Sequence, residues 1–202
     1  MTRLDPFYPV VGSLDWVQRL VPLGVKLIQL RIKQQPQDAV RQAVRAALAC
    51  CRAHGAQLVV NDHWQAAIEL GAPWIHLGQG DLDHADLAAI RRAGVRLGVS
   101  THDDDELTRA LGVAPDYVAL GPIYPTTSKV MPWAQQGLAR IGEWKRRIGA
   151  LPLVAIGGIS CERAADCLDA GACAVAAMSD VTDHPAPAVR VAQWLRTTRP
   201  RP

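Results

Sequence analysis

The sequence predicts a single eight-stranded α/β barrel, a (βα)8 or TIM barrel, and three observations carry that prediction. Short apolar runs alternate with longer stretches in which apolar residues recur every three or four positions. The short runs are continuously apolar, as parallel strands covered on both faces are. Eight such strand and helix pairs follow one another without a change in composition that would mark a linker, so we expect one domain over residues 1–202.

The expected strands are the short apolar runs at residues 8–11, 27–30, 58–60, 74–77, 97–99, 117–120, 153–156 and 174–178. The expected helices lie at residues 14–23, 36–54, 64–70, 83–93, 103–111, 137–148, 161–170 and 185–198. The clearest helix has one apolar stripe between Pro36, which suits a helix start, and Gly55, which suits a helix end. Left-handed caps are expected at Gly24, Gly71, Gly94, Gly112, Gly149 and Gly171.

The composition excludes several classes of protein. Of the residues, 49% are hydrophobic and 20% are charged, and the mean hydropathy is +0.03, so a disordered chain is excluded. No apolar run approaches the roughly 18 residues of a membrane span. The first residues lack an apolar segment of signal-peptide length, so we expect a cytoplasmic protein.

The charge distribution, the cysteines and the absence of one motif exclude further classes of partner and site. The net charge of +3 comes from 22 basic and 19 acidic residues without a one-sided cluster, so nucleic acid is not an expected partner. The five cysteines are odd in number and show no C-x-x-C spacing, which favours reduced thiols. No G-x-G-x-x-G follows the first expected strand, which disfavours a dinucleotide-binding open sheet. In a barrel, functional residues are expected at the carboxyl ends of the strands.

Polar and cationic side chains are expected at this end from two segments, the end of the second strand and the loop at 122–136, the longest in the chain. They are Gln29, Arg31, Lys33, Thr126, Thr127, Ser128 and Lys129. Hydroxyls beside a lysine can bind a phosphate or pyrophosphate, and long loops in compact domains tend to be functional. Solvated loops are the alternative, but two of the four lysines fall at this end of the barrel.

Two carboxylates follow adjacent strands of the expected barrel. Asp62 comes after the third strand and Asp81 after the fourth. Mg²⁺ typically takes one or two carboxylates and completes its shell with water and substrate phosphates, so the pair suits a phosphate-bound Mg²⁺. The alternative is that Asp81 or Asp83 only caps the following helix.

The fifth strand is followed by several polar residues, of which Ser100 is retained as a site candidate. His102 is ambiguous, because a lone histidine near a strand end is more often a hydrogen-bonded structural residue than a catalyst. Acidic residues at 103–106 are explained by the dipole of the helix that they begin, without a metal.

Paired glycines end the seventh strand. Gly157 and Gly158 permit close approach of the backbone to an anion, although a tight turn also explains them. Barrels often bind phosphate between the loops after the seventh and eighth strands, and Met178 and Ser179 end the eighth. The predicted mouth therefore has two anion sites, one for a diphosphate and one for a monophosphate. No nucleophile with an adjacent base is evident, so Mg²⁺ and Lys129 would stabilise a leaving diphosphate directly.

In order and spacing, several of these segments closely resemble the thiamine phosphate synthase family, and the likeness runs nearly end to end. They are residues 29–33 (QLRIK), 61–62 (ND), 76–81 (HLGQGD), 98–102 (GVSTH), 121–122 (GP), 125–129 (PTTSK) and 155–159 (AIGGI). The resemblance implies a barrel enzyme that joins 4-amino-2-methyl-5-(diphosphooxymethyl)pyrimidine to 4-methyl-5-(2-phosphoethyl)thiazole, or to its carboxylated form. The products would be thiamine monophosphate and pyrophosphate. In the family mechanism the diphosphate leaves first, and the thiazole nitrogen captures the resulting pyrimidine methylene cation.

Carried over position by position, the resemblance implies a role for each matching residue. The pyrimidine diphosphate would be bound by Gln29, Leu30, Arg31, Ile32, Lys33, Asn61, Ser100 and Lys129. The thiazole phosphate would be bound by Thr126, Thr127, Ser128, Gly157, Gly158, Met178 and Ser179. One Mg²⁺ per active site would be bound by Asp62 and Asp81. Catalysis would rest on Arg31, Lys33, Ser100 and Lys129.

Two positions depart from the family pattern. Ile32 stands where many members have glutamate, which puts a functional role for that side chain in doubt, and Ser128 stands where threonine is usual. The nearest alternative function is a thiazole tautomerase with the same barrel. The residues retained against this alternative are Lys33, Asp62, Asp81 and Lys129. A non-catalytic phosphate binder would have little use for a metal pair and a second cationic loop.

Overall fold

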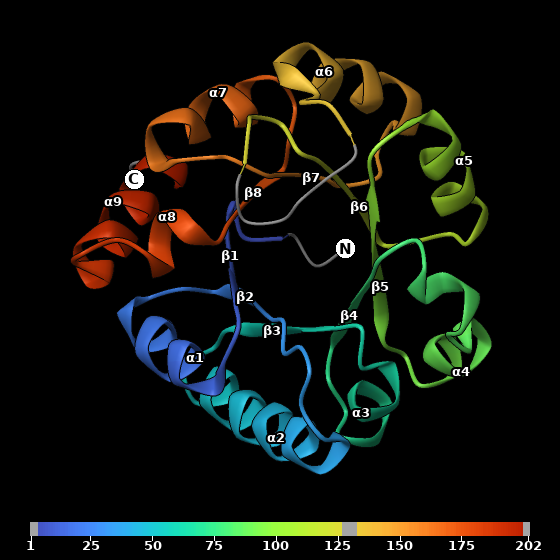
Figure 1. The fold of residues 1–202 in the computed structure, drawn as a ribbon, viewed down its shortest axis with the longest axis vertical. Helices are drawn as coiled ribbons and strands as arrows, with labels where there is room; N and C mark the ends of the chain where they lie inside the picture. Colours follow the sequence, from blue (N-terminus) through green and yellow to red (C-terminus); the bar gives the residue numbers. More distant parts are fainter. Residues whose placement is uncertain (1–3, 127–132, 200–202) are drawn as a thin grey trace.

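Eight parallel strands close into a barrel in the computed structural model, which describes residues 4–126 and 133–199. Each strand pairs with the next along the chain, and β8 pairs with β1. The strands are β1 (Phe7–Val11), β2 (Leu27–Leu30), β3 (Gln57–Asn61), β4 (Trp74–Leu77), β5 (Arg96–Thr101), β6 (Tyr117–Leu120), β7 (Leu153–Ile156) and β8 (Ala174–Ala177). With helices between them around the outside, this confirms the predicted barrel (Figure 1).

The helices form an outer ring around the strands (Figure 1). They are α1 (Leu14–Leu20), α2 (Gln37–Ala53), α3 (Trp64–Glu69), α4 (Leu87–Arg92), α5 (Asp104–Gly112), α6 (Gly137–Ile148), α7 (Ala164–Asp169), α8 (Ser179–Thr182) and α9 (Pro187–Thr198). Short 3₁₀ turns add η1 (Val21–Leu23), η2 (Asp81–Asp83) and η3 (Cys161–Arg163). Within residues 4–126 and 133–199, none of the helices has the length and apolar character that crossing a membrane requires.

The predicted helix at 83–93 is wrong at its start. A 3₁₀ turn ends at Asp83, and α4 begins only at Leu87. Asp86 is its cap, because its carboxylate accepts a hydrogen bond of 2.8 Å from the backbone N–H of Ala89. Neither Asp81 nor Asp83 therefore caps that helix, which removes the alternative explanation for their carboxylates.

Two smaller expectations at helix ends also differ from the structure. Gly112 is the last residue of α5 rather than a left-handed cap, and the positive φ of 47° falls two residues later, on Ala114. The short helix α8 directly after β8 was not predicted, because four residues are too few for an apolar period.

The barrel separates an inner core from an outer one. Alternate strand residues face opposite sides, so Tyr8 and Val10 belong to the inner core, while Phe7 and Val11 belong to the outer one. Helix side chains contribute to the outer core, where the ring of Trp194 in α9 stacks on Phe7 with centroids 4.9 Å apart. A polar side chain at an inward strand position therefore lies inside the barrel, below its mouth.

Candidate active site at the mouth of the barrel

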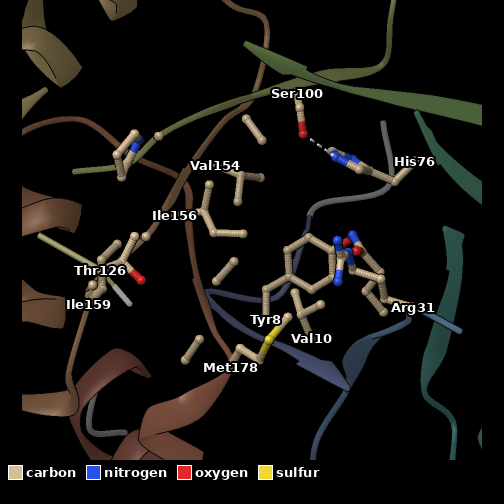
Figure 2. A pocket seen from close by; sticks show the side chains of 18 of the residues that line it. Tyr8, Val10, Arg31, His76, Ser100, Thr126, Val154, Ile156, Ile159 and Met178 are labelled. Carbon is tan, nitrogen blue, oxygen red and sulfur yellow. Dashed lines mark hydrogen bonds between the residues drawn. The ribbon is translucent and has the colours of Figure 1, made fainter. Parts of the chain in front are cut away.

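A pocket opens at the carboxyl ends of the strands and contains residues from every strand or the loop that follows it (Figure 2). Nine of the residues predicted for the site line it, namely Gln29, Arg31, Asn61, Ser100, Thr126, Gly157, Gly158, Met178 and Ser179. The side chains of Leu30 and Ile32 instead pack in the outer core. An apolar residue at position 32 is therefore accommodated by burial. Thr127, Ser128 and Lys129 lie outside the described residues.

The predicted metal pair lies beside the pocket. Asp62 follows β3 with a φ of 62°, and its backbone N–H donates to the carbonyl of His76 at 2.9 Å. The Asp81 carboxylate accepts from the backbone N–H of Gly78 at 3.0 Å and lies within hydrogen-bonding reach of the Asp62 carboxyl. Burial, and then the nearby Asp62 charge, raise the pKa of Asp81. The Asp62 carboxylate also contacts the Lys33 ammonium.

This donor set fits a magnesium ion. Mg²⁺ is usually bound by one or two carboxylates, with water and phosphate filling its other positions, and the Asp81 carboxyl, whose pKa is raised beside Asp62, would be stabilised in its charged form by a cation. Among the residues described, no group of three histidine, cysteine, aspartate or glutamate side chains converges to hold a metal. A closed zinc-type centre therefore has no counterpart in those parts of the chain, whereas an open carboxylate pair does.

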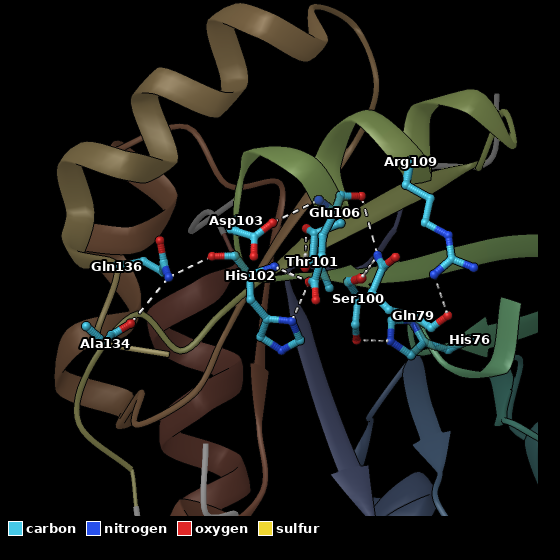
Figure 3. Close-up of polar contacts among 11 residues, drawn as sticks. His76, Gln79, Ser100, Thr101, His102, Asp103, Glu106, Arg109, Ala134 and Gln136 are labelled. Atoms are coloured by element: carbon cyan, nitrogen blue, oxygen red, sulfur yellow. Dashed lines mark hydrogen bonds and ion pairs between the residues drawn. The ribbon is translucent and has the colours of Figure 1, made fainter. Parts of the chain in front are cut away.

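A chain of hydrogen bonds crosses the interior of the barrel below the pocket. Gln29 Nε2 lies 2.9 Å from the Tyr8 hydroxyl, which lies 2.9 Å from the Tyr117 hydroxyl. Tyr117 is 2.8 Å from Nδ1 of His76. Nε2 of His76 is 2.7 Å from Oγ of Ser100 (Figure 3). Burial lowers the pKa of His76 to about 4, so the ring is neutral at physiological pH.

Tyr8, His76 and Tyr117 are members of the site that were not predicted from the sequence. All three lie inside strands that were interpreted as uniformly apolar runs, although each occupies an inward position. The signal that could have found them is a side chain with a polar atom inside an otherwise apolar strand, because a buried polar atom needs a hydrogen-bonding partner.

His102 has structural partners at the edge of the pocket. Its Nδ1 donates to the Glu106 carboxylate at 2.7 Å, and its ring stacks on Trp133 with centroids 3.9 Å apart. Gln136 Nε2 donates to the backbone carbonyl of His102 at 2.8 Å (Figure 3). Asp103 caps α5 by accepting from the backbone N–H of Glu106. These contacts agree with the structural interpretation of the histidine and of the acidic run.

The glycine pair joins two of the loops at the mouth. Gly157 and Gly158 have φ values of 97° and 64°. The carbonyl of Gly157 accepts from the backbone N–H of Tyr124 at 3.0 Å, so the segment after β6 is bonded to the turn after β7. A Cβ at position 158 would overlap the carbonyl oxygen of Pro125. Glycine is therefore required for the close contact that brings Thr126 to the pocket.

Ion pairs from the buried Arg190 fix the turn that follows β8. Arg190 of α9 donates to both oxygens of Asp180, at 2.7 and 2.8 Å, and to both oxygens of Glu162, at 2.6 and 2.8 Å. Trp194 Nε1 donates to Asp180 at 2.7 Å. Asp180 comes directly after Ser179, so α9 holds the segment that presents Ser179 to the pocket.

Arg190→Met is expected to lower the free energy of unfolding by roughly 2–4 kcal/mol at neutral pH, because Asp180 loses its buried partner. Hydrogen bonds from Arg190 lower the pKa of Glu162 to about 2. That stabilisation is present above the unfolded value near 4.5 and is lost as pH falls through about 2, so the variant should lose less stability on acidification. Urea unfolding at pH 7 and pH 3 measures both effects.

Arg196→Met is the matched control, since Arg196 is exposed on the same helix and should change the unfolding free energy by less than about 0.5 kcal/mol. If Arg190→Met gave a pH dependence parallel to that of the unmodified protein, the ion pairs would not control the acid side of the stability curve.

Comparison with known proteins places the chain among proteins of one activity. A family model described as thiamine monophosphate synthase matches residues 8–181. The chain belongs to the thiamine monophosphate synthase family. The thiamine-phosphate synthase of Rhizobium etli is 58% identical over 198 residues, which cover 98% of this chain and 97% of that protein. That of Serratia proteamaculans is 52% identical, covering 94% of this chain and 89% of the relative.

A solved structure shares the fold of this thiamine monophosphate synthase family member. The thiamine phosphate pyrophosphorylase from Pyrococcus furiosus superposes with a TM-score of 0.83, covering 96% of this chain and 95% of that chain, at 22% sequence identity. The full-length matches to thiamine-phosphate synthases identify the chain as an enzyme of the transferase class. The predicted resemblance to the family is thereby confirmed.

Proposed function

We propose that the chain condenses 4-amino-2-methyl-5-(diphosphooxymethyl)pyrimidine with 4-methyl-5-(2-phosphoethyl)thiazole to give thiamine monophosphate and pyrophosphate. With the carboxylated form of the thiazole, carbon dioxide would be released as a third product. The observation that supports this proposal is that one pocket at the barrel mouth contains both Arg31 and the glycine turn with Ser179, with Lys33 paired to Asp62 next to it. These groups could bind two different anions. A one-substrate enzyme would need to bind only one of them.

The residues on the diphosphate side would supply positive charge that stabilises the leaving diphosphate. The bond between the methylene carbon and the bridging oxygen breaks, and both electrons go to the diphosphate. Arg31 lines the pocket, and the Lys33 ammonium lies against Asp62, so both cations can face the developing charge. Asp62 and Asp81 would hold Mg²⁺, which when bound supplies further positive charge to the diphosphate. Ser100 would donate a hydrogen bond to it, and Lys129 would add a third cation.

The thiazole side supplies alignment. The amino group of the electron-rich pyrimidine stabilises the methylene cation, and the thiazole nitrogen then donates its lone pair to the methylene carbon. Thr126, Gly158 and Ser179 line the same pocket and would hold the thiazole phosphate. Thr127 and Ser128 would contribute further hydroxyl donors to it. Holding the nucleophile close to the cation replaces general-base chemistry, because no proton has to be removed from the thiazole nitrogen.

The purified protein, supplied with both substrates and Mg²⁺, should release pyrophosphate and form thiamine monophosphate in equal amounts. Chromatography of thiamine monophosphate and a coupled pyrophosphate assay measure the two products. Omitting either substrate, or adding EDTA, is the control and should stop product formation. Interconversion of the thiazole isomers without either product would instead identify a tautomerase, and binding without any reaction would identify a phosphate-binding protein.

A further inference from the structure

We propose that the hydrogen-bonded chain inside the barrel fixes the direction of the Ser100 hydroxyl, so that its proton points into the pocket as a donor. Tyr117 and His76 are the positioning residues, and they act through Ser100. The proposal deepens the proposed function, because it rests on that function for the diphosphate as the group that Ser100 meets.

The chain is continuous from one side of the barrel to the other. It begins at Gln29 on β2, passes through the hydroxyls of Tyr8 and Tyr117 on β1 and β6, and continues through the His76 ring on β4. It ends at Ser100 on β5, which lines the pocket together with His76 (Figure 2). All four links are between 2.7 and 2.9 Å long. Each is within the range of a well-formed hydrogen bond.

The first member sets the direction of the chain. The amide nitrogen of Gln29 can only donate, so the Tyr8 oxygen accepts from it. Tyr8 then has one proton of its own, and the acceptor within reach is the Tyr117 oxygen. Since a buried donor without an acceptor costs about 1–3 kcal/mol, the favoured arrangement is the one in which every hydroxyl proton has an acceptor. In that arrangement Tyr117 donates to Nδ1 of His76.

The tautomer of His76 decides whether the Ser100 hydroxyl accepts a hydrogen bond from the ring or donates one to it. Both ring nitrogens of His76 are hydrogen-bonded to hydroxyl groups rather than to carboxylates, and the residue is 6% exposed, so the neutral ring is favoured. A neutral ring has one N–H, and since Nδ1 accepts, Nε2 carries the proton. Nε2 then donates to Oγ of Ser100, whose own proton is left to point into the pocket.

The barrel is built to hold Tyr117 in this place. A Cβ at position 98 would overlap the phenol ring of Tyr117, so glycine at that position on β5 leaves the space that the ring fills. The rings of Trp74 and Tyr8 pack against Tyr117 with centroids 5.7 and 6.3 Å away. The hydroxyl of Tyr117 therefore has little freedom to leave the chain, and it sits beneath the pocket without lining it.

The direct test is the tautomer of His76 in the ligand-free protein. In ¹⁵N-labelled protein at neutral pH, the imidazole nitrogens give separate signals for protonated and unprotonated positions. Among the six histidines, the His76 signals are those lost in His76→Gln. We expect a protonated Nε2 and an unprotonated Nδ1. A protonated Nδ1 would mean that the chain runs the other way, with Ser100 donating to His76, and would overturn the proposal.

The kinetic test is Tyr117→Phe, which keeps the ring and removes the hydroxyl. Without that donor, His76 no longer has to keep Nδ1 unprotonated, and Ser100 can turn its proton toward the ring. We expect kcat to fall about tenfold, the KM for the thiazole phosphate to change less than about twofold, and the protonated Nε2 signal to weaken. In a Ser100→Ala background the same substitution should change kcat by less than about twofold, because the hydroxyl through which Tyr117 acts has been removed.

Tyr124→Phe is the matched control, because the Tyr124 hydroxyl contacts Cys167 and is not a member of the hydrogen-bonded chain inside the barrel. It should leave the His76 signals unchanged, and any effect that it has on kcat should be the same in the Ser100→Ala background. A Tyr117→Phe enzyme with unchanged kcat, or with the same loss in the Ser100→Ala background, would show that Tyr117 does not act through Ser100. The tautomer measurement needs no kinetic variant, so it decides the direction even if Tyr117→Phe folds poorly. A protein that makes no thiamine monophosphate but has the Nε2 tautomer would refute the proposed function. The inferred direction of the hydrogen bonds from Gln29 to Ser100 would still hold.

Discussion

Asp62→Asn should reduce turnover by roughly 1,000-fold or more and remove its dependence on Mg²⁺, while the barrel stays folded. Asparagine keeps the size of the side chain and removes its charge. It also tolerates the positive φ of 62° better than most residues, so the loss reports on the carboxylate rather than on the backbone. Asp62→Ala should abolish turnover as well, with an added loss of stability of up to about 1 kcal/mol from the strained conformation.

The measurements are a Mg²⁺ titration of the initial rate and a thermal unfolding curve for each variant. Asp83→Ala is the control, because Asp83 lies in the same 3₁₀ turn as Asp81 but its side chain is 58% exposed and pairs with Arg109. It should keep turnover and Mg²⁺ dependence. Activity and Mg²⁺ dependence that survive in Asp62→Asn would discard the assignment of the metal to this pair.

The barrel could be predicted because its strands are covered on both sides. Each strand has to be apolar in the inner and the outer core at once, which produces short continuous runs such as residues 117–120 that stand out from the helical period. The same coverage hides the inner polar chain. Tyr117 and His76 lie in runs that are otherwise apolar, and the neighbouring sequence does not indicate that their polar atoms meet inside the barrel.

The start of the helix after β4 could not be predicted from residue types alone. Asp81, Asp83 and Asp86 are all suitable caps by residue type, so the sequence offers three starting points for one helix. Tertiary contacts decide among them: Asp81 turns back to Gly78 and Asp62, and Asp83 pairs with Arg109 of α5. Only Asp86 is left to cap α4, and this division of roles also leaves Asp81 beside the pocket.

The partners that fix the loops come from distant parts of the chain. Arg190 was predicted only as part of a helix, yet it joins residues 10 and 28 positions away in the sequence. A helical period specifies which face of α9 is buried, but it does not specify which carboxylates meet that face. Strand ends could therefore be assigned to the site from sequence, whereas the residues that hold the loops in place could not.

Gly158→Ala should raise the KM for the thiazole phosphate by roughly 100-fold and lower the free energy of unfolding by roughly 2–4 kcal/mol. The new Cβ would overlap the carbonyl oxygen of Pro125 and lie 2.7 Å from that of Tyr124. Both are backbone atoms, which cannot rotate away as a flexible side chain can. The positive φ of 64° adds strain. The segment that carries Thr126 must then move away from the turn after β7.

Gly142→Ala is the matched control, because Gly142 lies inside α6 and a Cβ there would approach Ala170 no closer than 3.7 Å. It should raise stability by about 0.5–1 kcal/mol and leave both KM values unchanged. The two variants add the same methyl group, so thermal unfolding and the KM for each substrate separate its bulk from its position. If the contact between the two loops forms the thiazole phosphate site, the KM for the pyrimidine diphosphate should change much less in Gly158→Ala. An equal rise in both KM values would mean that the turn supports the whole mouth rather than one anion site.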